Sequence, residues 1–117
     1  MHKSFAQIGE FLNQCNFKGS DRHFFHRVTG SHVILVQLDG SPDGKGFTVS
    51  YGLHPILPSV QKIHHRDYLF PNCKFKGLVI NTRKNPVWNY HLDNDAFTTL
   101  SSRLLAGISA LEAKACH

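Results

Sequence analysis

Histidine is the residue type in this sequence with the greatest potential for chemistry, because an imidazole can bind a metal ion or transfer a proton near neutral pH. The 117 residues include nine histidines, which are His2, His23, His26, His32, His54, His64, His65, His91 and His117. A zinc site needs three or four converging ligands, which His-x3-His and Cys-x2-Cys pairs supply locally. Neither spacing occurs, so we predict no metal ion and no cofactor. A site assembled from distant elements is the alternative.

Two local histidine pairs also lack the spacing needed to bind one metal ion together. His23 and His26 lie three residues apart in a strand-like segment, and His64 and His65 are adjacent. Side chains at odd spacing along an extended chain point to opposite faces. We therefore expect each pair to point apart, unless the backbone around His64 is irregular.

The nearest arrangement to a catalytic site is the run His64, His65, Arg66 and Asp67. A histidine and an aspartate for proton transfer stand here beside a guanidinium that can stabilise a phosphate or an oxyanion. No second group of carboxylates is spaced for a metal pair. A His-dependent hydrolase or metal enzyme is the third functional hypothesis, and a solvated turn is the structural alternative.

Basic and aromatic residues are interleaved in the segment 18–27, and a second basic pair follows at 83–84. Lysine and arginine can contact phosphates, and an aromatic ring can stack on a base. A nucleic-acid-binding protein is therefore the second hypothesis, although a strand with a basic exposed side gives the same pattern. The residues that would serve it are Lys18, Arg22, Phe24, Arg27, Arg83 and Lys84.

Composition and charge indicate one globular domain with a mildly basic surface. Hydrophobic residues make up 41% of the chain, and nine of them are phenylalanines, which predicts a core built around phenyl rings. Thirteen Lys and Arg residues against eight Asp and Glu give a formal charge of +5. This charge favours an acidic partner, either nucleic acid or an acidic protein face.

Three cysteines, Cys15, Cys73 and Cys116, are odd in number and far apart, which argues against a disulfide framework. The first residues lack the apolar core and cleavage site of a secretory signal, and no apolar run approaches the ~18 residues of a membrane span. We therefore expect a cytoplasmic protein that makes no membrane contact.

Hydrophobic periodicity predicts a helix at each end of the chain with strands between them. Apolar residues recur at helical spacing over 4–15 and again from an Asp93 or Asp95 cap to about residue 113. Strand patterns occupy 22–28, 32–38, 47–53 and 75–82, and the segment after Pro86 is extended. The middle segment, 54–77, is interrupted by prolines and permits only a short helix or an irregular crossover.

The fold class that follows is α+β, a single domain spanning 1–117 with an antiparallel sheet of about four to five strands flanked by the two helices. The glycine-rich segment 39–46 joins two strands and is expected to be a flexible hairpin tip. The strand that follows it alternates large apolar residues with Thr48, Ser50 and Gly52. This small polar face leaves room for something to lie across it.

Two phrases in the sequence resemble a family of short bacterial proteins known as a domain of unknown function. The first is of the type Phe-Lys-x-x-Gly-x-x-Phe-x-Arg, and the second is of the type Phe-Thr-x-Asn-Leu-Gly. The glycine of the first is displaced to Gly19, and Ser50-Tyr51 stands in place of Asn-Leu in the second. The resemblance implies a fold and a bacterial or phage setting, and it carries over no activity. The matching residues are Phe17, Lys18, Phe25, Arg27, Phe47, Thr48 and Gly52.

The leading hypothesis is a small protein-binding domain without catalytic activity. Small proteins of this kind often accompany toxin genes. By analogy, we expect an immunity protein or inhibitor that blocks a toxin or another enzyme. A hairpin tip able to enter a cleft and a basic surface suited to an acidic partner favour this hypothesis. The residues expected to contact the partner are Arg22, Arg27, Asp43, Lys45, Arg66 and Trp88.

Overall fold

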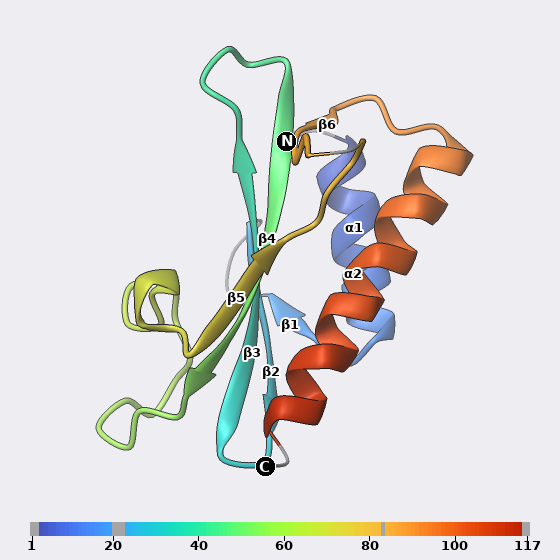
Figure 1. Cartoon of the computed structure of the whole chain (residues 1–117). Coiled ribbons are helices and arrows are strands. Elements are labelled where there is room, and N and C mark those ends of the chain that lie inside the picture. Colours follow the sequence, from blue (N-terminus) through green and yellow to red (C-terminus); the bar gives the residue numbers. More distant parts are fainter. Residues whose placement is uncertain (1–2, 20–22, 83, 116–117) are drawn as a thin grey trace.

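The structure is a computed structural model that describes residues 3–19, 23–82 and 84–115. Two helices enclose six strands and a short 3₁₀ turn in the sequence (Figure 1). In chain order the elements are α1 (Lys3–Gln14), β1 (Lys18–Gly19), β2 (Phe24–Thr29), β3 (His32–Gly40), β4 (Gly46–Pro55), η1 (Phe70–Asn72), β5 (Phe75–Leu78), β6 (Trp88–Asn89) and α2 (Asn94–Ala115).

The strands form one antiparallel sheet in the order β1-β2-β3-β4-β5, and β6 also pairs with β4. The long hairpin of β3 and β4 is the centre, with Gln37 opposite Ser50 and Leu35 opposite Gly52. β5 pairs with the second half of β4, while β6 pairs with its start at Gly46 and Phe47. The predicted α+β fold with its antiparallel sheet and terminal helices is confirmed.

One face of the sheet is covered by both helices (Figure 1). Buried residues of α1 and α2 form a single apolar cluster with Ile34, Val36 and Leu38 of β3, as their alternation predicts. The carboxylate of Asp93 accepts a hydrogen bond from the amide of Ala96 at 2.7 Å and thereby caps α2. Gly107 lets α2 approach the sheet, because a methyl group there would lie 2.5 Å from Cζ of Tyr51.

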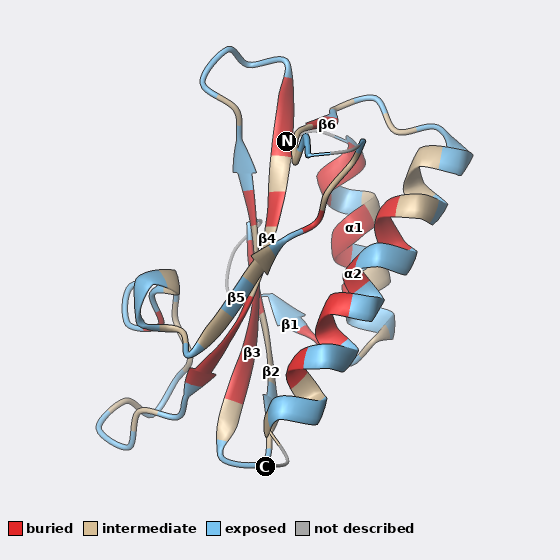
Figure 2. Cartoon of the chain, viewed as in Figure 1, coloured by how far each residue is buried: buried red, intermediate tan, exposed pale blue. Residues whose placement is uncertain are grey.

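The other face of the sheet is covered by neither α1 nor α2. The crossover, defined here as residues 56–74, runs over part of this face (Figure 1). Tyr68 packs there with Phe24, Val33 and Leu35, and Ile63 and other half-buried crossover residues complete this second apolar cluster. Burial is therefore continuous beneath the helices and interrupted on the crossover side (Figure 2). The short helix or irregular crossover expected for 54–77 matches residues 56–74 with η1, whereas 54–55 belong to β4 and 75–77 belong to β5.

Two of the predicted strands are shorter than expected. β5 ends at Leu78 instead of Thr82, and β6 is limited to Trp88 and Asn89. A turn takes up the chain between them, with Thr82 bridged to Asn85 and the side chain of Asn81 donating to the carbonyl of Val87 at 2.9 Å. No helix in the described part of the chain is long and apolar enough to cross a membrane.

Candidate functional site

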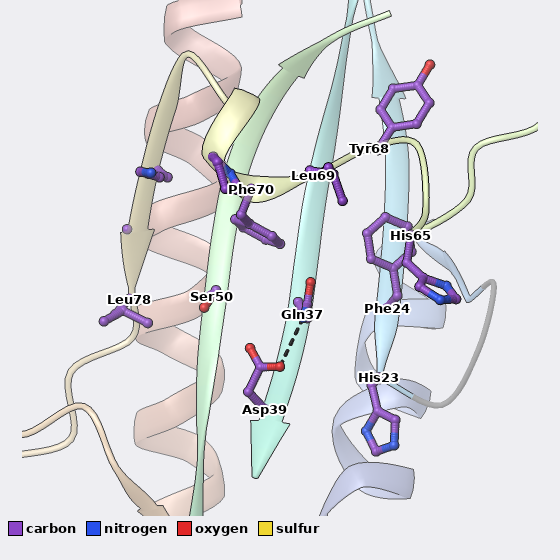
Figure 3. Close-up of a pocket in the computed structure, with 13 residues that line it drawn as sticks. His23, Phe24, Gln37, Asp39, Ser50, His65, Tyr68, Leu69, Phe70 and Leu78 are labelled. Carbon is purple, nitrogen blue, oxygen red and sulfur yellow. Dashed lines mark hydrogen bonds between the residues drawn. The ribbon is translucent and has the colours of Figure 1, made fainter. Parts of the chain in front are cut away.

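A groove of about 620 Å³ lies on the sheet face that the helices leave open. Its floor is formed by β3 and β4, one wall by the crossover with η1, a second wall by β5, and the remaining side by the start of β2 (Figure 3). The residues that line it are His23, Phe24, Gln37, Asp39, Ser50, His65, Tyr68, Leu69, Phe70, Pro71, Lys76, Gly77 and Leu78.

The floor of the groove is polar because the small-residue face of β4 meets the polar end of β3. Gln37 is paired with Ser50 in the hairpin register, and Asp39 is paired with Thr48. The Gln37 amide donates to Asp39 Oδ1 at 2.9 Å, so these two side chains are held together along β3 (Figure 3). The floor therefore offers an amide oxygen, a carboxylate and a hydroxyl to a bound group.

The walls of the groove are apolar and partly open to solvent. Leu69 from the crossover is 45% exposed and Leu78 from β5 is 43% exposed. Phe24 and Tyr68 line the groove from beneath, although both are buried. A concave surface lined by apolar side chains with a few polar groups is typical of recognition sites, because water is displaced from apolar surface when a partner binds.

Tyr68 and His54 hold the crossover against the sheet. The Tyr68 hydroxyl accepts a hydrogen bond from the amide of Leu57 at 2.9 Å, and its ring lies 4.7 Å from that of His54. Gly52 of β4 gives the crossover room to approach, because a methyl group at this position would lie 2.7 Å from Sγ of Cys73. The small face of β4 is thus filled at one end and open at the other.

The net positive charge of the chain lies entirely outside the two helices. α1 and α2 together contain three basic and three acidic residues, which leaves ten Lys and Arg against five Asp and Glu for the rest of the chain. Within 54–78 the balance is Lys62, Arg66, Lys74 and Lys76 against Asp67. The segment 54–78 is consequently basic.

The thiol closest to the groove is not a nucleophile at neutral pH. Burial raises the pKa of Cys73 to about 11, and the opposing effect of Lys76 is smaller. Cysteine attacks as a thiolate, and a pKa this high keeps the thiol protonated. Cys73 instead packs at the edge of the second apolar cluster.

Trp88 and Phe24, two residues predicted to contact a partner or a base, are buried. Trp88 is 1% exposed, and its indole nitrogen donates to the carbonyl of Val79 at 3.0 Å. Phe24 is likewise 1% exposed and belongs to the cluster beneath the crossover. Both rings pack in the apolar interior and are not accessible to a partner. The prediction that Trp88 contacts a partner is therefore wrong, and so is the prediction that Phe24 stacks on a base.

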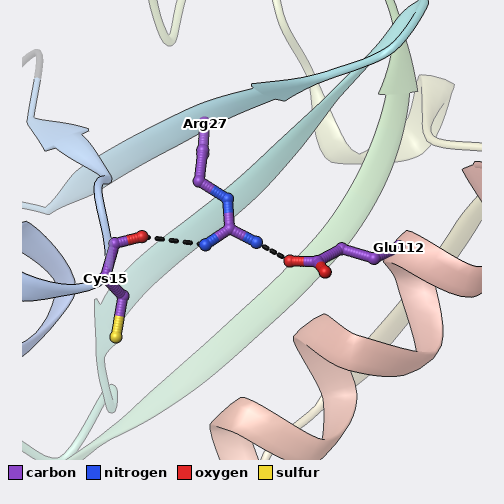
Figure 4. A network of polar contacts seen from close by, with 3 residues as sticks. All are labelled: Cys15, Arg27 and Glu112. Atoms are coloured by element: carbon purple, nitrogen blue, oxygen red, sulfur yellow. Dashed lines mark hydrogen bonds and ion pairs between the residues drawn. The ribbon is translucent and has the colours of Figure 1, made fainter.

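Arg27 is held between the ends of the two helices (Figure 4). Its guanidinium donates to the carbonyl of Cys15 at 2.8 Å and forms an ion pair with Glu112 of α2. The same guanidinium lies 4.8 Å above the ring of Phe17. Phe17 and Arg27, both from the family-like phrase, therefore have a structural role here, and the resemblance to that family stays a prediction.

The three remaining predicted contact residues that the structure describes are exposed and do not form one site. Asp43 and Lys45 lie at the hairpin tip, where Asp43 accepts from Ser41 Oγ at 2.6 Å and from the Lys45 amide at 3.0 Å. These hydrogen bonds lower the pKa of Asp43. Arg66 is exposed in the crossover, and Arg22 lies outside the described residues.

The residues predicted to bind nucleic acid are not brought together. Lys18 lies in β1 at one edge of the sheet, and Lys84 lies in the turn between β5 and β6 at the other edge. Arg22 and Arg83 lie outside the described residues. The structure therefore assembles no continuous basic track from the residues it describes.

His64 and His65 are closer together than their adjacent positions in an extended chain would allow. Their ring centroids are 4.2 Å apart because the backbone turns here, with amides of Asp67 and Tyr68 bonded to the carbonyl of His64. The Arg66 amide bonds to His64 Nδ1 at 3.2 Å, which occupies one ring nitrogen. No group of three or more potential metal ligands occurs among the residues that the structure describes.

Sequence reasoning missed the two leucines that form the walls of the groove. The sequence predicts a strand at Leu78 but does not indicate on which face of the sheet its side chain lies. Leu69 lies in the segment that has no periodic pattern. The available signal was the small polar face of β4, because Thr48, Ser50 and Gly52 imply that a neighbour or a ligand lies across it. Comparison with protein-family models, curated proteins and solved structures gives no match.

Proposed function

We propose that the chain is a non-enzymatic protein-binding domain that holds an acidic partner in the groove on its helix-free face. The observation that carries this proposal is the exposure of Leu69 and Leu78 on two walls of one groove. Interfaces are anchored by a few apolar or aromatic groups that enter pockets, with polar contacts around them. The groove offers both kinds of contact.

Charge favours an acidic partner. Within the groove the charges of Lys76 and Asp39 offset each other, and the 54–78 segment that surrounds it has four basic residues against one acidic residue. Complementary charge speeds encounter and selects among partners, while the apolar walls supply affinity. The immunity or inhibitor role expected from the sequence is one case of this proposal, in which the partner is a toxin or another enzyme.

The site does not support the catalytic alternative. The Cys73 thiol is protonated at neutral pH, and the paired imidazoles of His64 and His65 lie in a turn where one ring nitrogen already accepts a backbone hydrogen bond. Asp67 contributes only a backbone hydrogen bond to this turn in the structure. A general base needs a positioned substrate and an oriented proton acceptor.

The test compares two leucine variants with a matched control. Leu69→Gln and Leu78→Gln change the groove walls, whereas Leu105→Gln changes a leucine of similar exposure, 40%, on α2. Each tagged protein is used to capture partners from an extract of its own organism at moderate salt after nuclease treatment. We expect one protein to be retained by the wild type and by the Leu105→Gln variant.

The two groove variants should lose that protein, with a dissociation constant raised about tenfold or more in a purified complex. A partner bound equally by all four proteins would overturn the proposal, since the groove walls would then play no part. Retention that disappears on nuclease treatment would instead favour the nucleic-acid hypothesis.

A further inference from the structure

A second hollow lies at the β1 edge of the sheet and is distinct from the groove. It has a volume of about 620 Å³ and is formed by Asn16, which follows α1, by β1 and β2, and by residues 61–63 of the crossover. Its charged or titratable lining residues are Lys18, His26, Arg27 and Lys62. None of the described residues that line it is acidic.

Lys18 and His26 face each other across the β1–β2 ladder. They are directly paired in the register, so their side chains project from the same face of the sheet. Two groups that are both positive when protonated are unfavourable in this position unless something compensates them. Lys62, from the crossover, adds a third positive group over the same hollow.

The cation nearest to this pair is already neutralised elsewhere. The guanidinium of Arg27 is held by Glu112 and by the carbonyl of Cys15, so Glu112 compensates Arg27, and among the described lining residues no acidic side chain compensates Lys18 and Lys62. Lys18, His26 and Lys62 therefore form a positive cluster that attracts an anion from solution.

We propose that this hollow binds an organic anion through a phosphate or carboxylate group held by Lys18, His26 and Lys62. The volume exceeds what a bare phosphate needs, and Val28, which is 54% exposed, offers apolar surface to the rest of the ligand. This site is separate from the groove proposed for protein binding and stands or falls independently of it.

The state of His26 fits such a site. Its Nδ1 atom is buried and has no hydrogen-bond partner in the described part of the chain, and Nε2 is not among the buried unpartnered atoms. A neutral ring then keeps its proton on Nε2, where it can donate to an anion. Burial first, and then the charge of Lys18, lower the pKa of His26.

An anion bound between Lys18 and His26 would offset the charge of Lys18, which lowers the pKa of His26. Binding and protonation are reciprocal, so an anion that favours the imidazolium must raise the pKa of His26 and must bind more tightly as the pH falls. The titratable groups that line the hollow with the imidazole are Lys18 from β1 and Lys62 from the crossover, whereas Arg27, adjacent on β2, directs its guanidinium to Cys15 and Glu112.

The experiment follows the imidazole of His26 by NMR in the full chain, with the signal assigned from the His26→Gln variant. Inorganic phosphate and acetate are titrated separately at constant ionic strength against sodium chloride, over pH 5 to 8. The two probes distinguish a phosphate-bearing ligand from a carboxylate-bearing one. We expect at least one of them to raise the pKa of His26 in a saturable way that chloride does not reproduce.

Lys18→Gln and Lys62→Gln should each weaken that response about three- to tenfold, because each removes one charge-assisted contact. Lys18→Arg should preserve it, and Lys45→Gln at the hairpin tip is the control that should leave it unchanged. All of these positions except His26 are exposed, so the variants are expected to fold. A response equal to that of chloride, or one unaffected by both lysine substitutions, would overturn the proposal.

Discussion

The two faces of the sheet are covered in different ways. The helix-covered face contains the main apolar core, and the opposite face contains the groove proposed for recognition. The helix-covered face is filled by two amphipathic helices whose apolar residues form one cluster with β3 and β4. The opposite face is covered by an irregular crossover that buries only the end near Val33, Leu35 and His54. The uncovered end of that face is the groove. The two regular helices therefore cover their face of the sheet completely, whereas the irregular crossover leaves part of the opposite face accessible.

Trp88→Ala should have the largest effect, because it opens a cavity on the helix-covered face. The ring is 1% exposed and its nitrogen is bonded to the Val79 carbonyl. Removing a buried aromatic ring of this size costs about 3–5 kcal/mol of unfolding free energy. Urea denaturation followed by circular dichroism measures this loss. If Trp88 were a surface contact, as the sequence suggested, the substitution would weaken binding and leave the denaturation midpoint almost unchanged.

Tyr68→Phe should have a smaller effect that is confined to the crossover. It removes the acceptor of the Leu57 amide, which costs about 0.5–1.5 kcal/mol for a hydrogen bond of this kind. Amide hydrogen exchange should accelerate at Leu57 and its neighbours while the β3 and β4 amides keep their protection. Tyr51→Phe, which removes a hydroxyl from the helix-covered side, is the matched control. Equal acceleration in both variants would show that the crossover is not anchored through Tyr68.

The same difference explains what the sequence could predict. Helical spacing in the first and last segments and alternation in β3 and β4 arise from burial against a regular surface, so the helix-covered face was predicted correctly in class and in facing residues. The crossover is stabilised by particular contacts between Tyr68, His54 and Gly52, which are distant in sequence and have no period. Neither the wall formed by Leu69 nor the closeness of the His64 and His65 rings was predictable from spacing.

Individual charged residues were the least predictable part of the site. Arg27 belongs to a basic and aromatic run that suggested an exposed binding strand, but its guanidinium is held by Glu112, a residue 85 positions later in the chain. Lys18, from the same run, is exposed and lies across from His26. Which cation is compensated internally depends on the position of α2, and that position is a property of the tertiary fold.

Leu69→Gln and Leu78→Gln should leave stability nearly unchanged, in contrast to Trp88→Ala. Both side chains are almost half exposed, and substitutions at such positions usually change the unfolding free energy by less than about 0.5 kcal/mol. Urea denaturation of the two variants beside Leu105→Gln tests this expectation. A loss comparable to that of Tyr68→Phe would mean that these leucines hold the crossover in place, and their effect on partner binding would then be indirect.

The smallest expected effect is a pH dependence that originates at His26. Burial and Lys18 lower its pKa in the folded chain below the ordinary value of 6.5. The unfolded chain therefore takes up this proton first as the pH falls, and the free energy of unfolding decreases from about pH 6.5 down through the folded pKa of His26. Well above pH 6.5 the imidazole is neutral in both the folded and the unfolded chain, and it contributes nothing to the slope.

The His26→Gln variant should lack this part of the decline, so its stability curve and that of the wild type should diverge below pH 6.5. Lys18→Gln should reduce the decline without abolishing it, because it removes the smaller of the two causes and leaves the burial of the ring. Urea denaturation from pH 5 to 8 in dilute chloride gives both comparisons. Parallel curves for wild type and His26→Gln would show that the imidazole is solvated equally in the folded and unfolded chains, which contradicts the buried Nδ1 atom.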